Sequence, residues 1–247
     1  MKLVVLAAGY ATRLYPLTLD RPKALLPVAG RPMLEHVLAR LAPIREVDVV
    51  YVVTNAKFAR HFRTWAAGYD AGGREVRVVD DGTTSDEDKL GAIGDLALVL
   101  RTAAVDDDVV VVAGDNLFSE DLADFGRYGR ERRAPVLAVY DVGSLDAIRS
   151  YNAIEVDEDG RITFFEEKPV DPKTTLTGIA LYFYPREVAP LIHRYVAEGN
   201  NADQPGRLVE WLYTRTPVYT WHVPGIWFDI GSEESLREAD RIFSALR

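Results

Sequence analysis

Two basic side chains near the N-terminus are spaced to bind an anion. Residues 6–18 read LAAGYATRLYPLT, and this run of small residues contains one arginine, Arg13, followed ten positions later by Lys23. Small residues such as Gly9 and Ala11 let backbone amides approach an anion closely, while arginine supplies a planar fork of donors and lysine a mobile charge. This combination predicts a phosphate-binding loop.

Prolines separate this loop from two familiar phosphate-binding motifs. A dinucleotide-binding fingerprint needs three glycines and an immediate helix, but prolines at positions 16, 22 and 27 exclude a helix before about residue 33. A Walker loop is excluded because no glycine in the sequence is followed by lysine and then serine or threonine. What remains is a long loop that prolines stiffen and that carries two cations.

Acidic residues further along the chain carry charges that phosphate chemistry needs. Asp115 follows the apolar run of residues 109–113, and open α/β sheets bind ligands at such strand ends. Asp229 lies in the aromatic setting IWFDIGS, and residues 164–169 read FFEEKP. Taken singly, each has an ordinary structural interpretation: a turn cap, a residue before a capped helix, and a solvated hairpin edge.

The composition excludes several function classes. The chain has 247 residues, 48% of them hydrophobic, and no cysteine, so it can bury a full core but cannot use disulfides or thiol catalysis. A net charge of −9 without a basic stripe argues against a nucleic-acid surface. No apolar run approaches the roughly 18 residues that a membrane span needs. We therefore expect a cytoplasmic protein that binds neither nucleic acid nor a membrane.

Strand and helix patterns alternate along the chain. Continuous apolar runs predict buried strands, and two short strands are expected to pair through a turn at residues 159–160. We expect an α/β protein with a three-layer α/β/α, Rossmann-like architecture and a mainly parallel mixed sheet. Strands are expected at residues 3–7, 47–53, 76–79, 109–113, 136–140, 153–156, 162–165, 179–184 and 218–222. Helices are expected from residue 33 and at residues 56–67, 88–102, 187–198, 206–213 and 233–246.

Four segments together resemble the sugar-1-phosphate nucleotidylyltransferases, and the glucose-1-phosphate thymidylyltransferases in particular. They are residues 6–18 with the following RPKALLPVAGRPMLEHVL, AGDN at 113–116, FFEEKP at 164–169 and IWFDIGS at 226–232. Members of this family join a nucleoside triphosphate to a sugar 1-phosphate and release pyrophosphate. The resemblance implies a single nucleotidyltransferase domain over residues 1–247, without the C-terminal β-helix extension that some relatives carry.

The resemblance also implies a role for each matching residue. Arg13, Lys23 and Lys168 would be the catalytic cations. Asp115 and Asp229 would share Mg²⁺, whose preference for oxygen ligands is met by two carboxylates and phosphate oxygens. The nucleotide would contact Leu6, Ala8, Gly9, Ala11, Thr12, Arg13, Gly91 and Ala92. The sugar phosphate would contact Asn116, Tyr151, Asn152, Glu167 and Lys168.

Departures from the family pattern leave the substrates open. Ala11 stands where the family loop has its second glycine, and Asn152 stands where a glycine follows the tyrosine that frames the sugar. Residues 80–94 would hold the base, although most of this segment reads as a solvated acidic loop, and it lacks the glutamine of thymidylyltransferases.

Other functions and the assembly state stay open as well. The alternatives are a cytidylyltransferase acting on an alcohol phosphate such as phosphocholine or inositol phosphate, and a non-catalytic regulatory relative that binds a sugar nucleotide. A glycosyltransferase is a third, but it would leave the loop at residues 6–18 unexplained. Assembly into a homo-oligomer is also left open.

Overall fold

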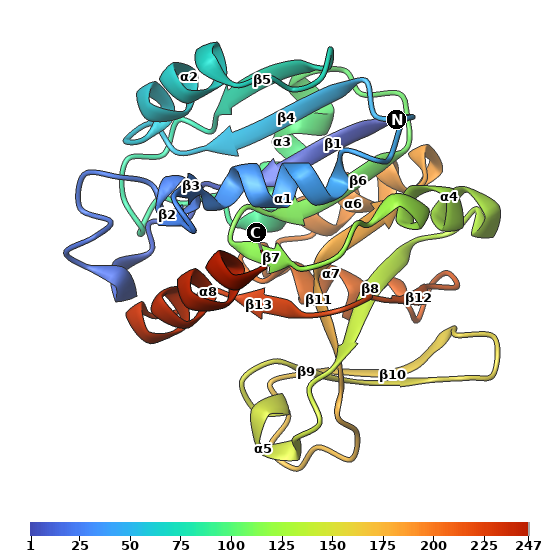
Figure 1. The fold of residues 1–247 in the computed structure, drawn as a ribbon. Coiled ribbons are helices and arrows are strands. Elements are labelled where there is room, and N and C mark those ends of the chain that lie inside the picture. The colour runs from blue at the N-terminus through green and yellow to red at the C-terminus, as the bar shows by residue number, and fades with distance from the viewer. Residues whose placement is uncertain (247) are drawn as a thin grey trace.

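β-branched runs build a seven-stranded sheet at the centre of the computed structural model, which describes residues 1–246 (Figure 1). Across the sheet the strands are β12 (Tyr219–His222), β8 (Val136–Asp141), β11 (Leu176–Tyr184), β6 (Val109–Ala113), β1 (Lys2–Leu6), β4 (Val49–Thr54) and β5 (Glu75–Asp80). Neighbouring strands run parallel except β11, which is antiparallel to both β6 and β8. The predicted mainly parallel mixed sheet is confirmed.

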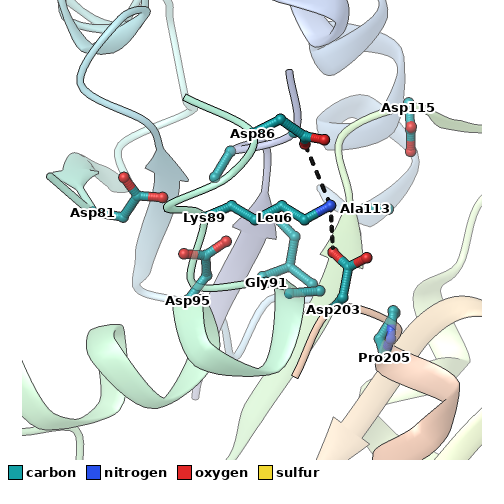
Figure 2. A pocket seen from close by; sticks show the side chains of 13 residues that line it. Leu6, Asp81, Asp86, Lys89, Gly91, Asp95, Ala113, Asp115, Asp203 and Pro205 are labelled. Atoms are coloured by element: carbon teal, nitrogen blue, oxygen red, sulfur yellow. Dashed lines mark ion pairs between the residues drawn. The ribbon is translucent and has the colours of Figure 1, made fainter. Parts of the chain in front are cut away.

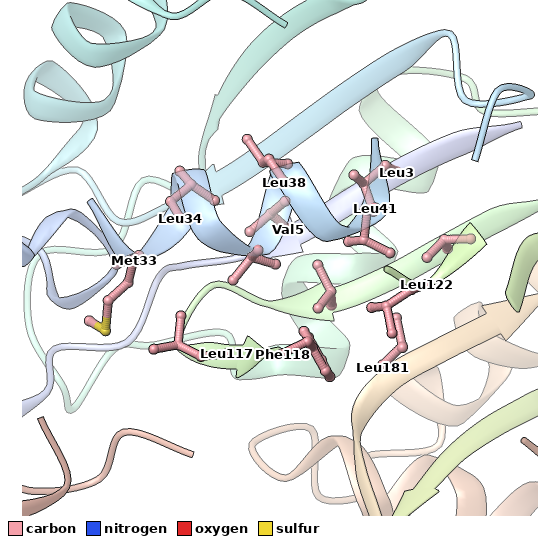
Figure 3. Close-up of a cluster of buried hydrophobic side chains, with 14 of the residues drawn as sticks. Leu3, Val5, Met33, Leu34, Leu38, Leu41, Leu117, Phe118, Leu122 and Leu181 are labelled. Carbon is pink, nitrogen blue, oxygen red and sulfur yellow. The ribbon is translucent and has the colours of Figure 1, made fainter. Parts of the chain in front are cut away.

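Helices cover both faces of the sheet. One face carries α1 (Met33–Leu41), α2 (Ala59–Gly68), α4 (Ala123–Arg132) and α8 (Glu233–Ala245), and the other carries α3 (Ala92–Thr102), α6 (Ala189–Ala197) and α7 (Pro205–Leu212). Successive strand residues point to opposite faces. Leu3 and Val5 therefore join the core under α1 (Figure 3), whereas Val4 joins the core under α3. The three-layer α/β/α architecture is confirmed.

Three small two-stranded sheets accompany the central one. They pair β7 (Asn116–Phe118) with β13 (Trp227–Asp229), β9 (Asn152–Val156) with β10 (Ile162–Glu167), and β2 (Pro27–Val28) with β3 (Arg31–Pro32). The hairpin predicted around residues 159–160 is confirmed, and Gly160 provides the positive φ of +76° in its turn. The sequence patterns did not predict β7 and β13, because three-residue strands show no measurable periodicity.

The remaining elements are short. Helix α5 spans Leu145–Ile148, and single 3₁₀ turns lie at Thr12–Leu14, Lys23–Leu25 and Arg186–Val188. As the prolines predict, α1 begins at Met33, and between β1 and α1 there are only 3₁₀ turns and the small β2–β3 sheet. No helix within residues 1–246 is long and apolar enough to cross a membrane.

Helix α3 begins later than the sequence predicts. The helix was expected from residue 88, but the Asp88 carboxylate accepts the backbone N–H of Thr84 at 3.1 Å and of Ser85 at 2.8 Å, which folds this segment into a tight turn. Gly91 then has a φ of +77°, and a Cβ there would lie 2.5 Å from the carbonyl oxygen of Ala202. The helix therefore starts at residue 92, and residues 81–91 form a loop beside it.

Candidate active site

The loops that follow β1 and β6 meet because these two strands are parallel neighbours. The backbone N–H of Gly114 donates to the carbonyl oxygen of Leu6 at 2.9 Å, which joins the loops where the strands end. A Cβ at Gly114 would lie 3.1 Å from the methyl group of Ala24, tighter than ordinary van der Waals contact. This close approach brings the N-terminal loop against the segment that carries Asp115.

The first result of this approach is an ion pair. The ammonium nitrogen of Lys23 lies 2.5 Å from Oδ2 of Asp115, although the two residues are 92 positions apart. Both residues line a cavity together with Leu6, Gly9 and Ala11 of the N-terminal loop. The structure thus gathers the predicted phosphate loop, one predicted catalytic cation and one predicted metal ligand.

Asn116 holds the two predicted metal ligands together. Its Nδ2 donates to Oδ1 of Asp115 at 3.1 Å and to Oδ1 of Asp229 at 3.4 Å, while its own Oδ1 accepts the indole N–H of Trp227 at 2.8 Å. Asn116 is 3% exposed. Asn116 was predicted to contact the sugar phosphate, but its side-chain amide is engaged within the protein. We therefore assign it to positioning the carboxylates.

The two carboxylates fit a divalent cation. Burial and the neighbouring Asp115 raise the pKa of Asp229 to about 6, against the opposing influence of Lys23 and Arg13. A raised carboxyl pKa means that the surrounding protein supplies too little positive charge to stabilise the ionised form. Residues 1–246 contain no cluster of three acidic, histidine or cysteine side chains for a metal. Mg²⁺ suits such a pair because it commonly binds one or two carboxylates and completes its shell with water and substrate phosphate oxygens.

A second wall of the site comes from the start and end of the β9–β10 hairpin. The backbone N–H of Lys168 donates to the carbonyl oxygen of Tyr151 at 2.7 Å, and Lys168 adopts a left-handed φ of +51°. The Tyr151 ring lies edge-on to Trp227 with centroids 5.5 Å apart. Burial and the charge of Asp229 raise the pKa of Tyr151. Tyr151 is therefore hydrogen-bonded to Lys168 through its backbone and lies close enough to Asp229 to feel its charge.

Glu167 is half-buried beside Lys168. Burial raises the pKa of its carboxyl group, while Arg207 and Lys168 act to lower it. Its Oε2 lies against Gly206 in the first turn of α7, 2.6 Å from where a Cβ would stand. The close approach of α7 thus fixes where this carboxylate can lie.

Asn152 was predicted to contact the sugar, but its side chain binds the protein backbone. Its Oδ1 accepts the backbone N–H of Gly178 at 2.7 Å, and its Nδ2 donates to the carbonyl oxygen of the same residue at 3.1 Å. The hydroxyl group of Thr177 also donates to Oδ1 of Asn152, at 3.2 Å. The Asn152 amide therefore clasps β9 to β11, and both of its ends are engaged by the protein.

The predicted nucleotide contacts are divided between two adjoining cavities. The larger group lines the cavity of Figure 2 together with Asp115: Leu6, Ala8, Gly9, Gly91 and Ala92. Ala11 lines the cavity beside Lys23. Thr12 and Arg13 lie on the exposed 3₁₀ turn that follows, and Arg13 is close enough to Asp229 to lower its pKa.

Ala11 shows what its departure from the family pattern means for the backbone. It has φ 50° and ψ 43°, in the left-handed region where the family loop has glycine. For a residue with a Cβ this conformation costs roughly 1–2 kcal/mol. The loop therefore keeps the backbone shape that a glycine would adopt.

The acidic lining of the nucleotide-side cavity was not predicted from the sequence. Its polar side chains are those of Asp81, Asp86, Lys89, Asp95 and Asp203, in addition to Asp115. The available signal was the run DDGTTSDEDK, which also matches a solvated loop. Asp203 gave no signal because the fold brings it from more than 100 positions away.

A family model described as nucleotidyl transferase matches residues 2–244. The chain belongs to this family. The bifunctional protein GlmU of Methanocaldococcus jannaschii is 24% identical over 241 residues, which cover 98% of this chain and 54% of that protein. The mannose-1-phosphate guanylyltransferase of Mycobacterium tuberculosis is 35% identical over 186 residues, which cover 75% of this chain and 49% of that protein. The chain spans about half the length of these two curated relatives.

The solved structures agree on the fold. A UDP-glucose pyrophosphorylase complexed with UDP-glucose superposes with a TM-score of 0.83 at 20% identity, covering 100% of this chain and 99% of that one. The family predicted from the four sequence motifs, and the fold predicted with it, are both confirmed.

Proposed function

We propose that the protein condenses a nucleoside triphosphate with a sugar 1-phosphate, giving a nucleotide sugar and pyrophosphate. One observation carries the proposal: Asp115, which lines the nucleotide-side cavity, is paired with Lys23 and is joined through Asn116 to Asp229, and Asp229 lies near Tyr151 of the wall formed by Tyr151 and Lys168. The relative that is 35% identical is named for guanylyl transfer to mannose 1-phosphate, which supports the reaction class.

The acceptor supplies its own nucleophile in this reaction. A sugar phosphate has a second pKa of about 6, so an anionic oxygen is present at neutral pH without a protein base. That oxygen forms a bond to the α-phosphorus while the bond between the α-phosphorus and the bridging α–β oxygen breaks, and pyrophosphate leaves with the electron pair. The barrier is the repulsion between two anions and their alignment, which fixed cations can overcome.

The residues of this chain divide that task between two ends of the site. We assign Lys23 and Arg13 to the triphosphate, since they belong to the small-residue loop, and Lys168 to the phosphate of the acceptor. Glu167 would accept hydrogen bonds from sugar hydroxyl groups, with Tyr151 packed beside it. Backbone groups of residues 8–12 and of Gly91 and Ala92 would surround the nucleotide.

Mg²⁺ completes the proposed site. Asp115 and Asp229 would hold it, and when bound it would neutralise phosphate oxygens of both substrates. Asn116 keeps the two carboxylates at a fixed separation through its hydrogen bonds to both. The raised pKa of Asp229 supports this assignment, because a cation would relieve the same charge imbalance.

Pyrophosphate release tests the proposal directly. The purified protein would be assayed with Mg²⁺, each of ATP, CTP, GTP, UTP and dTTP, and a panel of hexose 1-phosphates, phosphocholine and inositol phosphate. We expect release that requires both a triphosphate and a hexose 1-phosphate. Release with only the alcohol phosphates would replace this proposal by the cytidylyltransferase alternative, and sugar-nucleotide binding without any release would indicate a regulatory protein.

A further inference from the structure

Tyr10 joins the phosphate-binding loop to the loop that borders the nucleotide-side cavity. It follows Gly9 in the small-residue loop, and its side chain is 5% exposed. Its hydroxyl group lies 3.1 Å from Oγ1 of Thr83, which is 73 positions away in the sequence and equally buried. Thr83 belongs to residues 81–91, the loop between β5 and α3. One hydrogen bond between side chains thus connects two loops that both contribute to the lining of this cavity.

The hydrogen bonds continue from Thr83 into the wall of the cavity. The Thr83 hydroxyl donates to Oδ1 of Asp81 at 2.8 Å, and because a hydroxyl group has one hydrogen, the Tyr10 hydroxyl is the donor to Thr83. Asp81 and Asp95 lie next to each other (Figure 2), and burial, the charge of Asp81 and a hydrogen bond with it raise the pKa of Asp95 to about 8. Four side chains therefore link the phosphate-binding loop to the first turn of α3.

Both ends of this network reach residues that were predicted to contact the nucleotide. The backbone N–H of Asp95 donates to the carbonyl oxygen of Gly91 at 2.8 Å, and Gly91 and Ala92 line the cavity. At the other end, Tyr10 directly follows Gly9, which lines the same cavity. The network therefore holds the start of α3 in a fixed position relative to the phosphate-binding loop.

A second connection keeps both loops folded without the Tyr10 hydroxyl. The turn after β4 contacts both of them. Nδ2 of the fully buried Asn55 donates to the carbonyl oxygen of Ala8 at 2.8 Å, and the backbone N–H of Ala56 donates to the carbonyl oxygen of Thr83 at 2.9 Å. Loss of the Tyr10 hydroxyl should therefore leave the fold intact and change only how firmly the two loops are held together.

A nucleoside triphosphate in the proposed site would contact both loops at once, with its phosphates on one and its nucleoside against the other. Such a ligand binds more tightly when the two parts of its site are already held in place, because less conformational freedom is lost on binding. An inorganic polyphosphate would need the phosphate-binding loop alone. The connection between the loops should therefore favour the nucleoside triphosphate and leave the affinity for polyphosphate unchanged.

We propose that Tyr10 is a positioning residue for the nucleoside triphosphate: its hydrogen bond to Thr83 holds residues 81–91 where the nucleoside binds. Tyr151 and Lys168 of the acceptor wall are outside the network, so the effect is confined to the triphosphate. This inference rests on the proposed function, since it names a residue that acts on one of the two substrates of that site.

Binding measurements separate this role from a general structural one. Dissociation constants would be measured by calorimetry, with Mg²⁺, for ATP, CTP, GTP, UTP, dTTP and inorganic tripolyphosphate. Tyr10→Phe loses only the hydroxyl group, and we expect it to bind the preferred nucleoside triphosphate about three- to tenfold more weakly, the usual effect of losing one hydrogen bond. Tripolyphosphate should bind as it does to the wild type. The KM for the triphosphate should rise by a similar factor, while kcat and the KM for the hexose 1-phosphate stay unchanged.

Variants at Thr83 test the partner. Thr83→Ser keeps a hydroxyl group and should retain the wild-type affinity, whereas Thr83→Val should weaken binding of the nucleoside triphosphate at least as much as Tyr10→Phe does. Combining Tyr10→Phe with Thr83→Val should weaken it no further than Thr83→Val alone, because the two residues share one interaction. Tyr128→Phe, which removes a hydroxyl group that accepts a hydrogen bond from Arg132 on α4, is the matched control. Melting temperatures would show that each variant folds.

Wild-type affinity of Tyr10→Phe for every nucleoside triphosphate would overturn the inference. An equal loss of tripolyphosphate binding would also overturn it, because the effect would then belong to the phosphate-binding loop alone. Additive effects of the two substitutions would refute the pairing of Tyr10 with Thr83. The expected binding pattern without any pyrophosphate release would refute the proposed reaction and leave the role of Tyr10 standing.

Discussion

At the scale of single residues, the site depends on charges that are held by uncharged neighbours. Asn116 joins Asp115 to Asp229, and Trp227 in turn holds Asn116. The charged residues were assigned roles from the family resemblance, because each of them taken singly also has an ordinary structural interpretation. The roles of Asn116 and Asn152 could not be predicted, because their partners, Trp227 and Gly178, become neighbours only in the folded chain.

We expect Asp115→Asn to fold normally and to lose most of its activity. The change removes the negative charge that faces Lys23 and one proposed metal ligand, so kcat/KM should fall by roughly 100- to 1000-fold, about 3–4 kcal/mol of transition-state stabilisation. Pyrophosphate release and the melting temperature would be measured together. Asp121→Asn, an exposed carboxylate paired with Arg40, serves as the control. Full activity in Asp115→Asn would remove this residue from the mechanism.

Asp95 gives a pH-dependent prediction for stability. Its pKa is raised to about 8 in the folded protein, whereas an aspartate in the unfolded chain titrates near about 4. The folded state therefore binds the proton more tightly, and the stability that this carboxyl contributes is present below pH 4 and is lost as the pH rises towards 8.

Asp95→Asn removes that dependence. At pH 8 the variant should be more stable than the wild type by a few kcal/mol, an increase in melting temperature of roughly 5 °C or more, with little difference at pH 4. Thermal denaturation between pH 4 and pH 9 measures the effect, with the exposed Glu158→Gln as control. A difference between wild type and Asp95→Asn that is the same at every pH would contradict it.

At the scale of elements, the sequence predicted the features that depend on residues close together in the chain. Buried strands such as β1 and β6 show as unbroken apolar runs, and the prolines defined the start of α1. The delayed start of α3 depended on Asp88 and on the close approach of residues 201–203 to Gly91, and this second contact is tertiary. β7 and β13 are stable only as a pair, so neither was visible alone.

The approach of α7 to Glu167 gives a prediction at this scale. Gly206→Ala places a methyl group against the Glu167 carboxylate, which must then rotate away from its present position. We expect the KM for the sugar phosphate to rise severalfold while the KM for the triphosphate is unchanged, because only the acceptor wall is disturbed. Gly68→Ala at the end of α2 has open space around the new methyl group and is the control. Equal changes in both KM values would contradict the assignment of Glu167 to the acceptor.

At the scale of the whole molecule, the alternation of strands and helices was enough to predict the three layers and the mixed sheet. It also predicted that ligands would bind at the strand end before Asp115, and the structure places that end beside the end of β1, because the two strands are parallel neighbours. The contribution of the second wall was predictable only from the family motif, since nothing in the local pattern of residues 151–168 relates the hairpin to β13.

Ligand binding should stabilise the molecule as a unit. With Mg²⁺ and a preferred triphosphate at about 100 times the dissociation constant, the free energy of unfolding should rise by about 2.7 kcal/mol, which corresponds to roughly 5–10 °C in melting temperature for a chain of this size. Removing Mg²⁺ with EDTA should abolish most of this shift. Thermal scans with and without each component measure it.

The aspartate pair supplies the control for that measurement. Asp229→Asn should lose the part of the shift that depends on Mg²⁺ while it keeps any stabilisation by the triphosphate alone. A wild-type shift that EDTA leaves unchanged would contradict the assignment of Mg²⁺ to this pair.

The clasp between Asn152 and Gly178 anchors the acceptor wall at one fixed point of the central sheet. It fastens the start of the hairpin to β11, whose other end pairs with β6, the strand leading to Asp115. Exposed residues of the hairpin beyond the clasp can be exchanged with little effect on the strands that carry the polyphosphate end, whereas Ile154, Ile162 and Phe165 are buried in the core under α7. An engineer who wishes to broaden the range of acceptors should rebuild that outer part and leave Asn152, Thr177 and Gly178 untouched.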